Sequence, residues 1–236
     1  MKKVFITICF YSLIKFAAAQ TVDRNYATNG FMEIYDVKGK PVTSKSSVEV
    51  EGSPLLNEQW AFGEVRLKNG QWLKDVPLQF NLQTNELYFQ KNNTTFQFAE
   101  PVLQFSLAYT EEGTEKKVLF RAGYPAVDGK TANTFYQVLA EGPNVHLLKY
   151  VSKSVKDVYQ YNAPGKKRYW QMEELYLFDA STNRLINITK NKTPLTELLP
   201  AYAPILNESV KEKKGKLLSE QEWIELVQLI NQKKAF

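Results

Sequence analysis

Apolar and polar side chains alternate along much of the chain between positions 29 and about 188. The clearest run places Leu78, Phe80 and Leu82 on one side, with polar residues between them. A period of two puts one face of a strand on a core and the other in water. The pattern predicts further strands near residues 117–121, 134–140, 145–151, 169–178 and 185–188.

Turn residues separate these strands at short intervals. Asn69 and Gly70 lie between two such runs and predict a tight type I′ hairpin, in which both central residues have positive φ. About ten short strands with local connections favour a curled or barrel-like antiparallel sheet over a flat one. The pattern leaves both a barrel and a sandwich open.

The hydrophobic period changes in the last fifth of the chain. Thr193 is expected to cap a helix that has Pro194 at its first position, and a second short helix is expected over about 204–213. Ser219 and Glu222 form a capping box before a third helix. That helix carries an apolar stripe expected to pack on the sheet or the preceding helix: Trp223, Leu226, Val227 and Ile230.

These patterns predict an α+β fold that is mainly β. We expect an antiparallel β domain over residues 20–190 and a helical C-terminal segment of two or three helices over 191–236 that packs on it. The chain shows no linker-like change of composition and no repeat of fixed period.

Residues 1–19 are predicted to be a cleaved signal peptide. Two lysines precede an apolar run, and Ala17 and Ala19 give a small-residue cleavage site before Gln20. A membrane anchor is the alternative, but a span needs about 20 apolar residues, and Lys15 interrupts this run. The expected location is therefore the periplasm, the outer membrane surface or the cell exterior.

The predicted leader also changes the charge and the cysteine count. It contains Cys9, the only cysteine, so the mature chain has none. It also removes three lysines, which lowers the net charge from +5 to +2. Nucleic-acid binding needs clustered positive charge, so it is not expected. The mature chain has no second long apolar stretch, and no transmembrane helix is expected in it.

One segment resembles a family of uncharacterised exported proteins from flavobacteria and their relatives. Residues 52–60 read G-S-P-L-L-N-E-Q-W, and the N-G turn at Asn69 and Gly70 follows. The likeness continues through 76–82, 85–89, 136–142, 145–150 and 195–200. The resemblance implies export from a Gram-negative cell. It implies no activity and no catalytic residue, because the family has no established function.

The mature chain lacks most catalytic combinations. His146 is its only histidine, which excludes metal sites that need two histidines. It lies in a predicted strand, where it is expected to face solvent or to be satisfied within the sheet. No G-x-S-x-G, Walker or G-x-G-x-x-G motif occurs, and no catalytic residue, metal or cofactor is expected.

Paired acidic residues leave glycoside or peptide hydrolysis open as an alternative. Neighbouring acids on a strand point to opposite faces, so most of these pairs are not expected to converge. Solvated charge is the favoured interpretation of the three pairs, Glu49/Glu51, Glu111/Glu112 and Glu173/Glu174.

Aromatic residues, at 13% of the chain, give the one positive indication of function. They can stack on sugars or anchor a protein partner, although most are expected to be core. The hypothesis is a non-catalytic exported protein that binds an envelope protein or glycan; carriage of an apolar ligand in a barrel is a further alternative. The candidate binding patch is Tyr159, Tyr161, Lys166, Lys167, Arg168 and Trp170, with a mobile charged loop as the competing interpretation.

Overall fold

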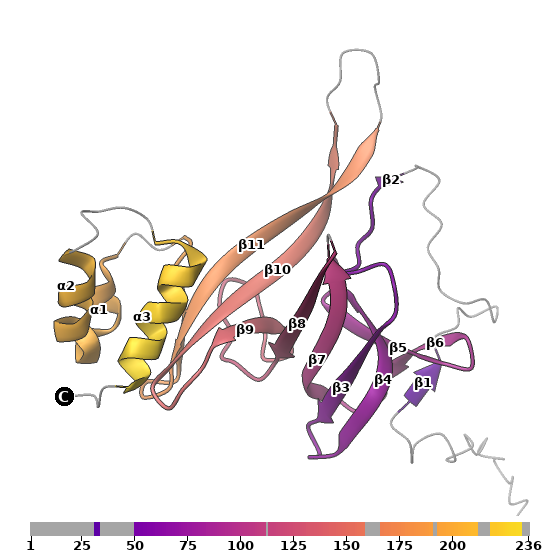
Figure 1. Ribbon diagram of the computed structural model, residues 1–236, viewed down its shortest axis with the longest axis horizontal. Coiled ribbons are helices and arrows are strands. Elements are labelled where there is room, and N and C mark those ends of the chain that lie inside the picture. The colour runs from indigo at the N-terminus through magenta and orange to yellow at the C-terminus, as the bar shows by residue number, and fades with distance from the viewer. Residues whose placement is uncertain are drawn as a thin grey trace, which may run out of the picture.

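The computed structural model describes residues 31–33, 50–111, 113–158, 166–190, 193–211 and 218–232, with the side chains of 31–33 and 209–211 left out. The predicted signal peptide, including Ala17, Ala19 and Gln20, lies outside the described residues and stays a prediction. Within the described part the fold is α+β and mainly β, as the alternating pattern predicts (Figure 1).

The strands of the described residues form one 12-stranded sheet in the order β1-β6-β5-β4-β3-β7-β8-β9-β10-β11-β12, and β2 pairs with β11. Their bounds are β1 Phe31–Glu33, β2 Val50–Glu51, β3 Ala61–Leu67, β4 Trp72–Asn81, β5 Glu86–Lys91, β6 Thr94–Phe98, β7 Val102–Glu111, β8 Thr114–Arg121, β9 Tyr136–Ala140, β10 Val145–Asp157, β11 Lys167–Asp179 and β12 Arg184–Asn187.

The sheet is strongly curled but is not closed into a barrel. The backbone N–H of Lys153 in β10 donates to the carbonyl of Leu82 at 3.2 Å, which brings β10 beside the end of β4. Every pairing is antiparallel except that of β2 with β11, which is parallel. The predicted curled antiparallel sheet is therefore confirmed, with one parallel pair added.

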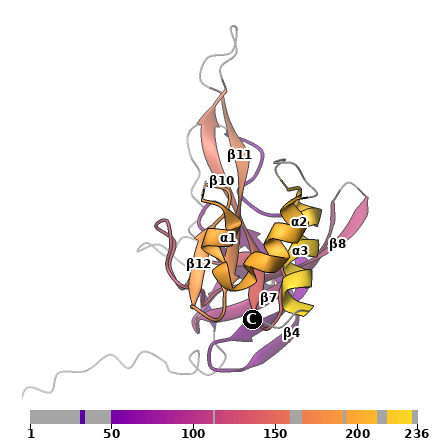
Figure 2. The ribbon, with the colours of Figure 1, turned by 90° about the vertical axis from the view of Figure 1, so that its left-hand side faces the viewer.

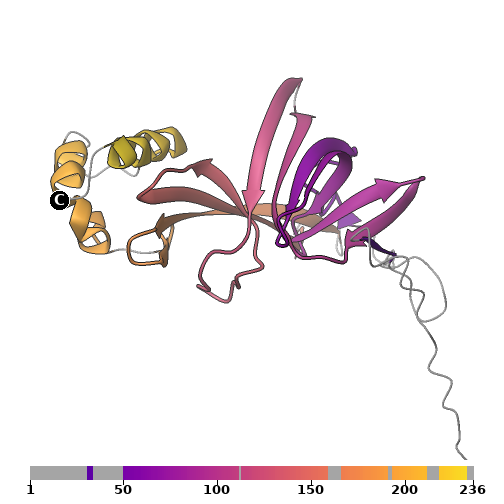
Figure 3. The ribbon, with the colours of Figure 1, turned by 90° about the horizontal axis from the view of Figure 1, so that it is seen from below.

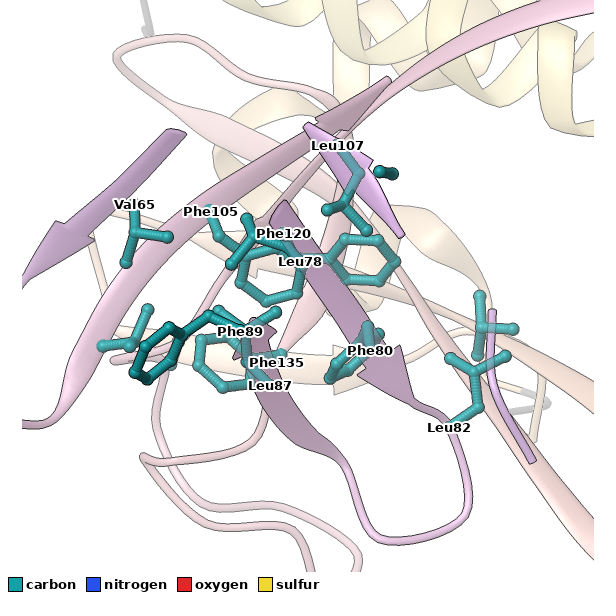
Figure 4. Packing of buried hydrophobic residues seen from close by; sticks show 14 of the residues in the cluster. Val65, Leu78, Phe80, Leu82, Leu87, Phe89, Phe105, Leu107, Phe120 and Phe135 are labelled. Carbon is teal, nitrogen blue, oxygen red and sulfur yellow. The ribbon is translucent and has the colours of Figure 1, made fainter. Parts of the chain in front are cut away.

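Phenylalanine rings fill the inside of the curl (Figure 4). Phe80 is fully buried, and its ring centroid lies 5.1 Å from that of Phe105 and 4.9 Å from that of Phe120. Phe135 closes the group with an edge-on contact to Phe80 at 5.9 Å. Leu78 and Leu82 are also fully buried, so the face predicted from their alternation is confirmed.

The turn between β3 and β4 differs from the prediction. Gly70 has a φ of +92°, but Asn69 is not among the residues with positive φ, so the turn is not type I′. The Gly70 N–H donates to the carbonyl of Leu67 at 3.0 Å, and the Leu67 N–H donates to that of Gln71 at 2.9 Å. The hairpin therefore has a three-residue loop with glycine at the left-handed position. One extra loop residue removes the need for positive φ at Asn69.

In the described part of the chain, three α-helices and one 3₁₀ turn follow the sheet: α1 (Leu195–Leu198), η2 (Pro200–Tyr202), α2 (Ala203–Lys211) and α3 (Glu220–Gln232). They lie at the end of the molecule away from the phenylalanine core (Figure 1). The apolar stripe of α3 is confirmed as a packing face, because Leu226, Val227 and Ile230 are buried against Val145 and Leu147 of β10.

The two predicted helix starts had different outcomes. The capping box before α3 is confirmed, since the Ser219 N–H donates to Glu222 Oε2 at 2.7 Å and the Glu222 N–H donates to Ser219 Oγ at 3.3 Å. The prediction for α1 is wrong by one residue, because Pro194, and not Thr193, occupies the N-cap position. A proline can hold the extended backbone of an N-cap, so the helix begins directly after it.

One side chain fastens α3 to the sheet. Asn231 Oδ1 accepts from the N–H groups of Asn144 and Val145 at 3.0 Å each. Its Nδ2 donates to the carbonyls of Val145 and Val227 at 2.8 and 2.9 Å. A Cβ on Gly142 would lie 2.3 Å from Asn231 Cγ, so glycine is the residue that leaves room for this contact.

Tyrosines form a third buried cluster on the other face of β10 and β11. Its buried members are Tyr124, Tyr136, Leu148, Tyr176 and Leu185. The segment between β8 and β9 crosses this face. In Figure 3, α3 lies above the sheet and this segment lies below it. The same strands thus carry helices on one face and a covering loop on the other.

Candidate functional site

The two faces of the β10–β11 hairpin have different surroundings. The register pairs Tyr150 with Glu174 and Ser154 with Trp170, so even-numbered residues of both strands share one face, called the outer face. On the opposite face Val151 belongs to the phenylalanine core and Leu147 packs on the helices. The two strands extend beyond their neighbours (Figures 1 and 2), which leaves the outer face open toward the hairpin tip.

Two large apolar side chains lie exposed on this outer face. Trp170 is 48% exposed and Met172 is 44% exposed, and they are two residues apart on β11. Ser154 and Ser152 are their partners on β10. The Lys156 Nζ lies 3.9 Å from the Met172 sulfur, so a positive charge borders the apolar pair. The result is an indole and a thioether presented beside serine hydroxyls.

The predicted binding patch is only partly brought together. Lys166 is exposed, and Arg168 and Trp170 share the outer face, but Lys167 lies on the other face of β11. Arg168 Nη2 donates to both carboxylate oxygens of Glu51 in β2, at 2.8 and 2.7 Å, so much of its charge is paired. Tyr159 and Tyr161 lie outside the described residues.

A charged network lies further along the same face, between the tyrosines and Met172. Glu174 Oε2 accepts from Lys130 Nζ at 2.9 Å and from the Tyr176 hydroxyl at 2.9 Å. Lys190 pairs with the other carboxylate oxygen of Glu174. Lys130 also lies 4.4 Å from the centre of the Tyr150 ring, a cation–π contact. One carboxylate thus joins the β8–β9 loop, β11 and the segment after β12.

This environment keeps Glu174 ionised. Burial opposes its charge, but hydrogen bonds from Lys190, Lys130 and Tyr176 outweigh burial and lower the pKa of Glu174 to about 2. Burial raises the pKa of Tyr176, and its hydrogen bond to Glu174 raises it further. Tyr176 therefore stays a protonated donor, and Glu174 is a fixed acceptor with no proton to give at neutral pH.

Asn187 extends the network to the edge of the sheet. It is buried in β12, and its Nδ2 donates to the Tyr176 hydroxyl at 3.0 Å and to Asp128 Oδ2 at 2.8 Å. Its Oδ1 accepts from the N–H groups of Thr189 and Lys190. Beside it lies a pocket of about 580 Å³. Its lining is Val127, Asp128, Arg184, Leu185, Ile186, Asn187 and Lys190.

His146 has surroundings close to those that its strand position predicts. It is half-buried in β10, and its Nδ1 lies 3.1 Å from the Tyr124 hydroxyl. Burial lowers the pKa of His146, while the negative charge of Glu141 opposes this shift. Of the two expected surroundings, solvent or a partner within the sheet, the structure gives a variant of the second, because the partner Tyr124 lies in the loop that covers the sheet. Tyr136, which belongs with Tyr124 to the tyrosine cluster, has a buried hydroxyl without a hydrogen-bond partner among the described residues.

The paired acids do not converge where the structure describes them. Glu173 lies 3.6 Å from Lys149 on one face, and Glu174 lies in its network on the other, as alternation predicts. Glu51 pairs with Arg168, and Glu111 pairs with Lys116. Glu49 and Glu112 lie outside the described residues.

Sequence reasoning missed the Glu174 network and Met172. Lys130 is 44 positions from Glu174 along the chain, and no local pattern indicates that they meet. Alternation along β11 does place Met172, Glu174 and Tyr176 on the face of Trp170, so the sequence held that part of the signal.

No family model, no curated protein and no solved structure matches this chain. Among the described residues, no helix has the length and apolar character needed to cross a membrane. The described part of the chain also holds no group of three or more His, Cys, Asp or Glu residues arranged to bind a metal ion.

Proposed function

We propose that this chain is a non-catalytic exported binding protein that acts in the cell envelope or outside the cell. We further propose that a partner protein contacts the outer face of β10–β11 through Trp170 and Met172. The observation that carries the proposal is the exposure of these two neighbouring side chains, 48% and 44%, on strands that extend beyond the rest of the sheet.

The composition of this face favours a protein partner over a glycan. Trp, Met, Tyr and Arg are enriched in the cores of protein–protein interfaces, and Trp170, Met172, Tyr150 and Arg168 all lie on the outer face. Aromatic anchors of this kind carry much of the binding energy when a partner covers them. A sugar would use the indole and the serine hydroxyls but would gain little from Met172.

Export rests on the sequence alone. The predicted signal peptide over 1–19 and the resemblance to exported flavobacterial proteins both support a location in the periplasm, at the outer membrane or outside the cell. The absence of cysteine after the leader is compatible with such a location, because oxidising compartments permit disulfides without requiring them.

The geometry gives the two alternatives little support. Acid-catalysed hydrolysis needs a carboxyl group that holds a proton at working pH, and Glu174 is ionised down to a pH of about 2. Carriage of an apolar ligand needs an open interior, whereas the inside of the curl is filled by rings such as Phe80 and Phe105 with centroids 5.1 Å apart.

The test compares three forms of residues 20–236 immobilised on a resin: the natural sequence, a Trp170→Ala/Met172→Ser double variant, and Phe62→Ser. Each is incubated with envelope fractions of a flavobacterium, and bound protein and bound sugar are measured separately. We expect the natural sequence to retain a protein that the double variant loses. Phe62 is 65% exposed on β3, away from the outer face, so its variant should bind like the natural sequence.

Three outcomes contradict the proposal. The first is that no protein is retained, the second is that the double variant retains the same protein, and the third is that sugar is retained in its place. Equal melting temperatures of the three forms, measured by circular dichroism, ensure that a loss of binding is not a loss of folding.

A further inference from the structure

In the described part of the chain the outer edge of β12 is unpaired, although its residues Leu185, Ile186 and Asn187 are largely buried. It is the last strand of the sheet, and no described strand pairs with its other side. The Ile188 N–H donates to the carbonyl of Leu175 in β11 at 2.9 Å. In an antiparallel ladder every second residue repeats this pattern, so Ile186 also turns its backbone groups toward β11. The N–H and C=O groups of Leu185 and Asn187 therefore point away from the sheet.

A pocket runs along this edge. The pocket of about 580 Å³ is lined by all four residues of β12, by Val127 and Asp128 of the β8–β9 loop, and by Lys190 after β12. The hydrogen bond from Asn187 Nδ2 to Asp128 Oδ2, at 2.8 Å, holds the loop in place. The outward backbone groups thus border a shallow hollow that is largely open to solvent.

The edge is only partly protected. Sheets block their edges with lysine, proline, bulges or a covering loop. The segment Leu185-Ile186-Asn187 contains no lysine, proline or bulge, but Lys190 and the β8–β9 loop residues Val127 and Asp128 line the pocket beside it. The one charge of the strand is Arg184, which is exposed and makes no ion pair among the described residues. An edge with these features is a site for strand addition.

Side-chain alternation defines what an added strand must look like. Leu185 faces the tyrosine cluster beside Val127, whereas Ile186 belongs to the helix-side core. By the same alternation Arg184 lies on the helix side. An added strand would place apolar side chains beside Val127 and acidic side chains beside Arg184. Asp128, next to Val127 on the loop, would repel acidic side chains on the Val127 side of the added strand.

We propose that β12 receives an extended segment of a partner protein, with apolar and acidic residues in alternation, which adds to the sheet as a further strand. This site is separate from the proposed function, because neither Trp170 nor Met172 lines the pocket. If strand addition at β12 is disproved, the proposed binding through Trp170 and Met172 is unaffected. If that binding is disproved, strand addition at β12 is likewise unaffected.

The probe is a blocked octapeptide that alternates valine with glutamate, compared with one that alternates valine with lysine. Like charges keep each peptide from pairing with itself. We expect the glutamate peptide to bind residues 20–236 about tenfold more tightly than the lysine peptide, measured by calorimetry. At saturation, the amide hydrogen exchange of Leu185 and Asn187, followed by NMR, should slow at least about tenfold.

Charge variants distinguish recognition of the peptide's charge from non-specific binding. Arg184→Glu should reverse the preference between the two peptides, and Lys117→Glu, an equal charge change on exposed β8, should leave it unchanged. Trp170→Ala/Met172→Ser should also leave it unchanged. If Arg184→Glu fails to fold, the natural sequence gives the same test, because added salt should weaken the glutamate peptide far more than the lysine peptide.

Three results overturn the proposal. One is unchanged amide exchange at Leu185 and Asn187 with either peptide at saturating concentration. Another is equal affinity for both peptides. The third is a dimer of the free chain in analytical ultracentrifugation with the same two amides protected, which would mean that a second copy occupies the edge.

Discussion

Glu173 and Glu174 are neighbours in β11 with opposite surroundings. The Glu173 side chain is exposed near Lys149, while Glu174 is enclosed by Lys130, Lys190 and Tyr176. One step along a strand turns a side chain to the other face, so identical residues acquire different surroundings. The energetic role of each acid therefore depends on which face it occupies.

Replacing Glu174 with Gln should destabilise the protein at neutral pH and remove part of its acid sensitivity. The pKa of Glu174 lies at about 2 in the folded protein, against an ordinary value of 4.5. Between these values the unfolded chain binds the extra proton, so its contribution to stability is present above pH 4.5 and is lost as the pH falls toward 2. Urea unfolding across this range should show the natural sequence and the variant converging.

Glu173→Gln is the matched control for this titration. Its side chain is 46% exposed, so it should change the free energy of unfolding little at any pH. A constant difference between Glu174→Gln and the natural sequence from neutral pH to pH 2 would contradict the assigned network.

Phe80→Ala should cost about 3–5 kcal/mol of unfolding free energy, because it opens a cavity among packed rings. Phe80 is fully buried, whereas Phe62 is 65% exposed on the neighbouring strand. Phe62→Ala should therefore change stability by less than about 0.5 kcal/mol. Urea denaturation measures both, and similar values for the two variants would be incompatible with the described core.

At the scale of elements, β10 connects the parts of the fold. Its 13 residues pair with β9 and β11, and its side chains enter all three buried clusters. Val151 lies in the phenylalanine core, Leu148 in the tyrosine cluster, and Val145 and Leu147 under the helices. A long strand can serve several cores because its register with β11 stays regular over its whole length.

Asn231→Ala should release the end of α3 from β10. The variant leaves the N–H groups of Asn144 and Val145 without their acceptor, and a buried unsatisfied group costs about 1–3 kcal/mol. Gln232→Ala, at an exposed neighbouring position, is the control and should be near neutral. The rate of amide hydrogen exchange at Val145 should rise in Asn231→Ala but not in Gln232→Ala. If Val145 stays protected in Asn231→Ala, the Asn231 side chain does not hold α3 to β10.

The whole molecule combines a curled sheet with a helical cover, and the cover hides an apolar face. The helices bury Val145, Leu147, Leu177 and Ile186 of the sheet. Exposed apolar area of this kind promotes association of soluble proteins. The helical segment predicted over 191–236 thus has a structural role where it is described.

Val227→Asp should detach the helices from the sheet. Val227 is fully buried between α3 and β10, and an unpaired buried carboxylate is strongly unfavourable. We expect increased binding of a hydrophobic dye and oligomers in size-exclusion chromatography. Gln228→Asp, one residue away and exposed, should behave like the natural sequence. A monomeric Val227→Asp variant without dye binding would argue against this packing.

Much of the fold could be predicted because its signals are local. Alternation identified Leu78, Phe80 and Leu82 as one face, and the capping box located the start of α3 at Ser219. Local signals were weaker where two turn geometries compete, as at Asn69, or where a proline sits at a helix boundary, as at Pro194. In both places, the error is a shift of one residue within a correctly identified element.

By itself the sequence determined which segments become strands and helices and which of their faces are apolar, since these depend on neighbours along the chain. Only the tertiary structure decided that Lys130, Glu174 and Lys190 meet, that Lys167 leaves the face of Trp170, and that β12 ends the described sheet with an unpaired edge. Those arrangements depend on strand order and on the path of the β8–β9 loop. They form only when segments distant in the sequence come into contact, and the local hydrophobic period does not indicate which segments do so.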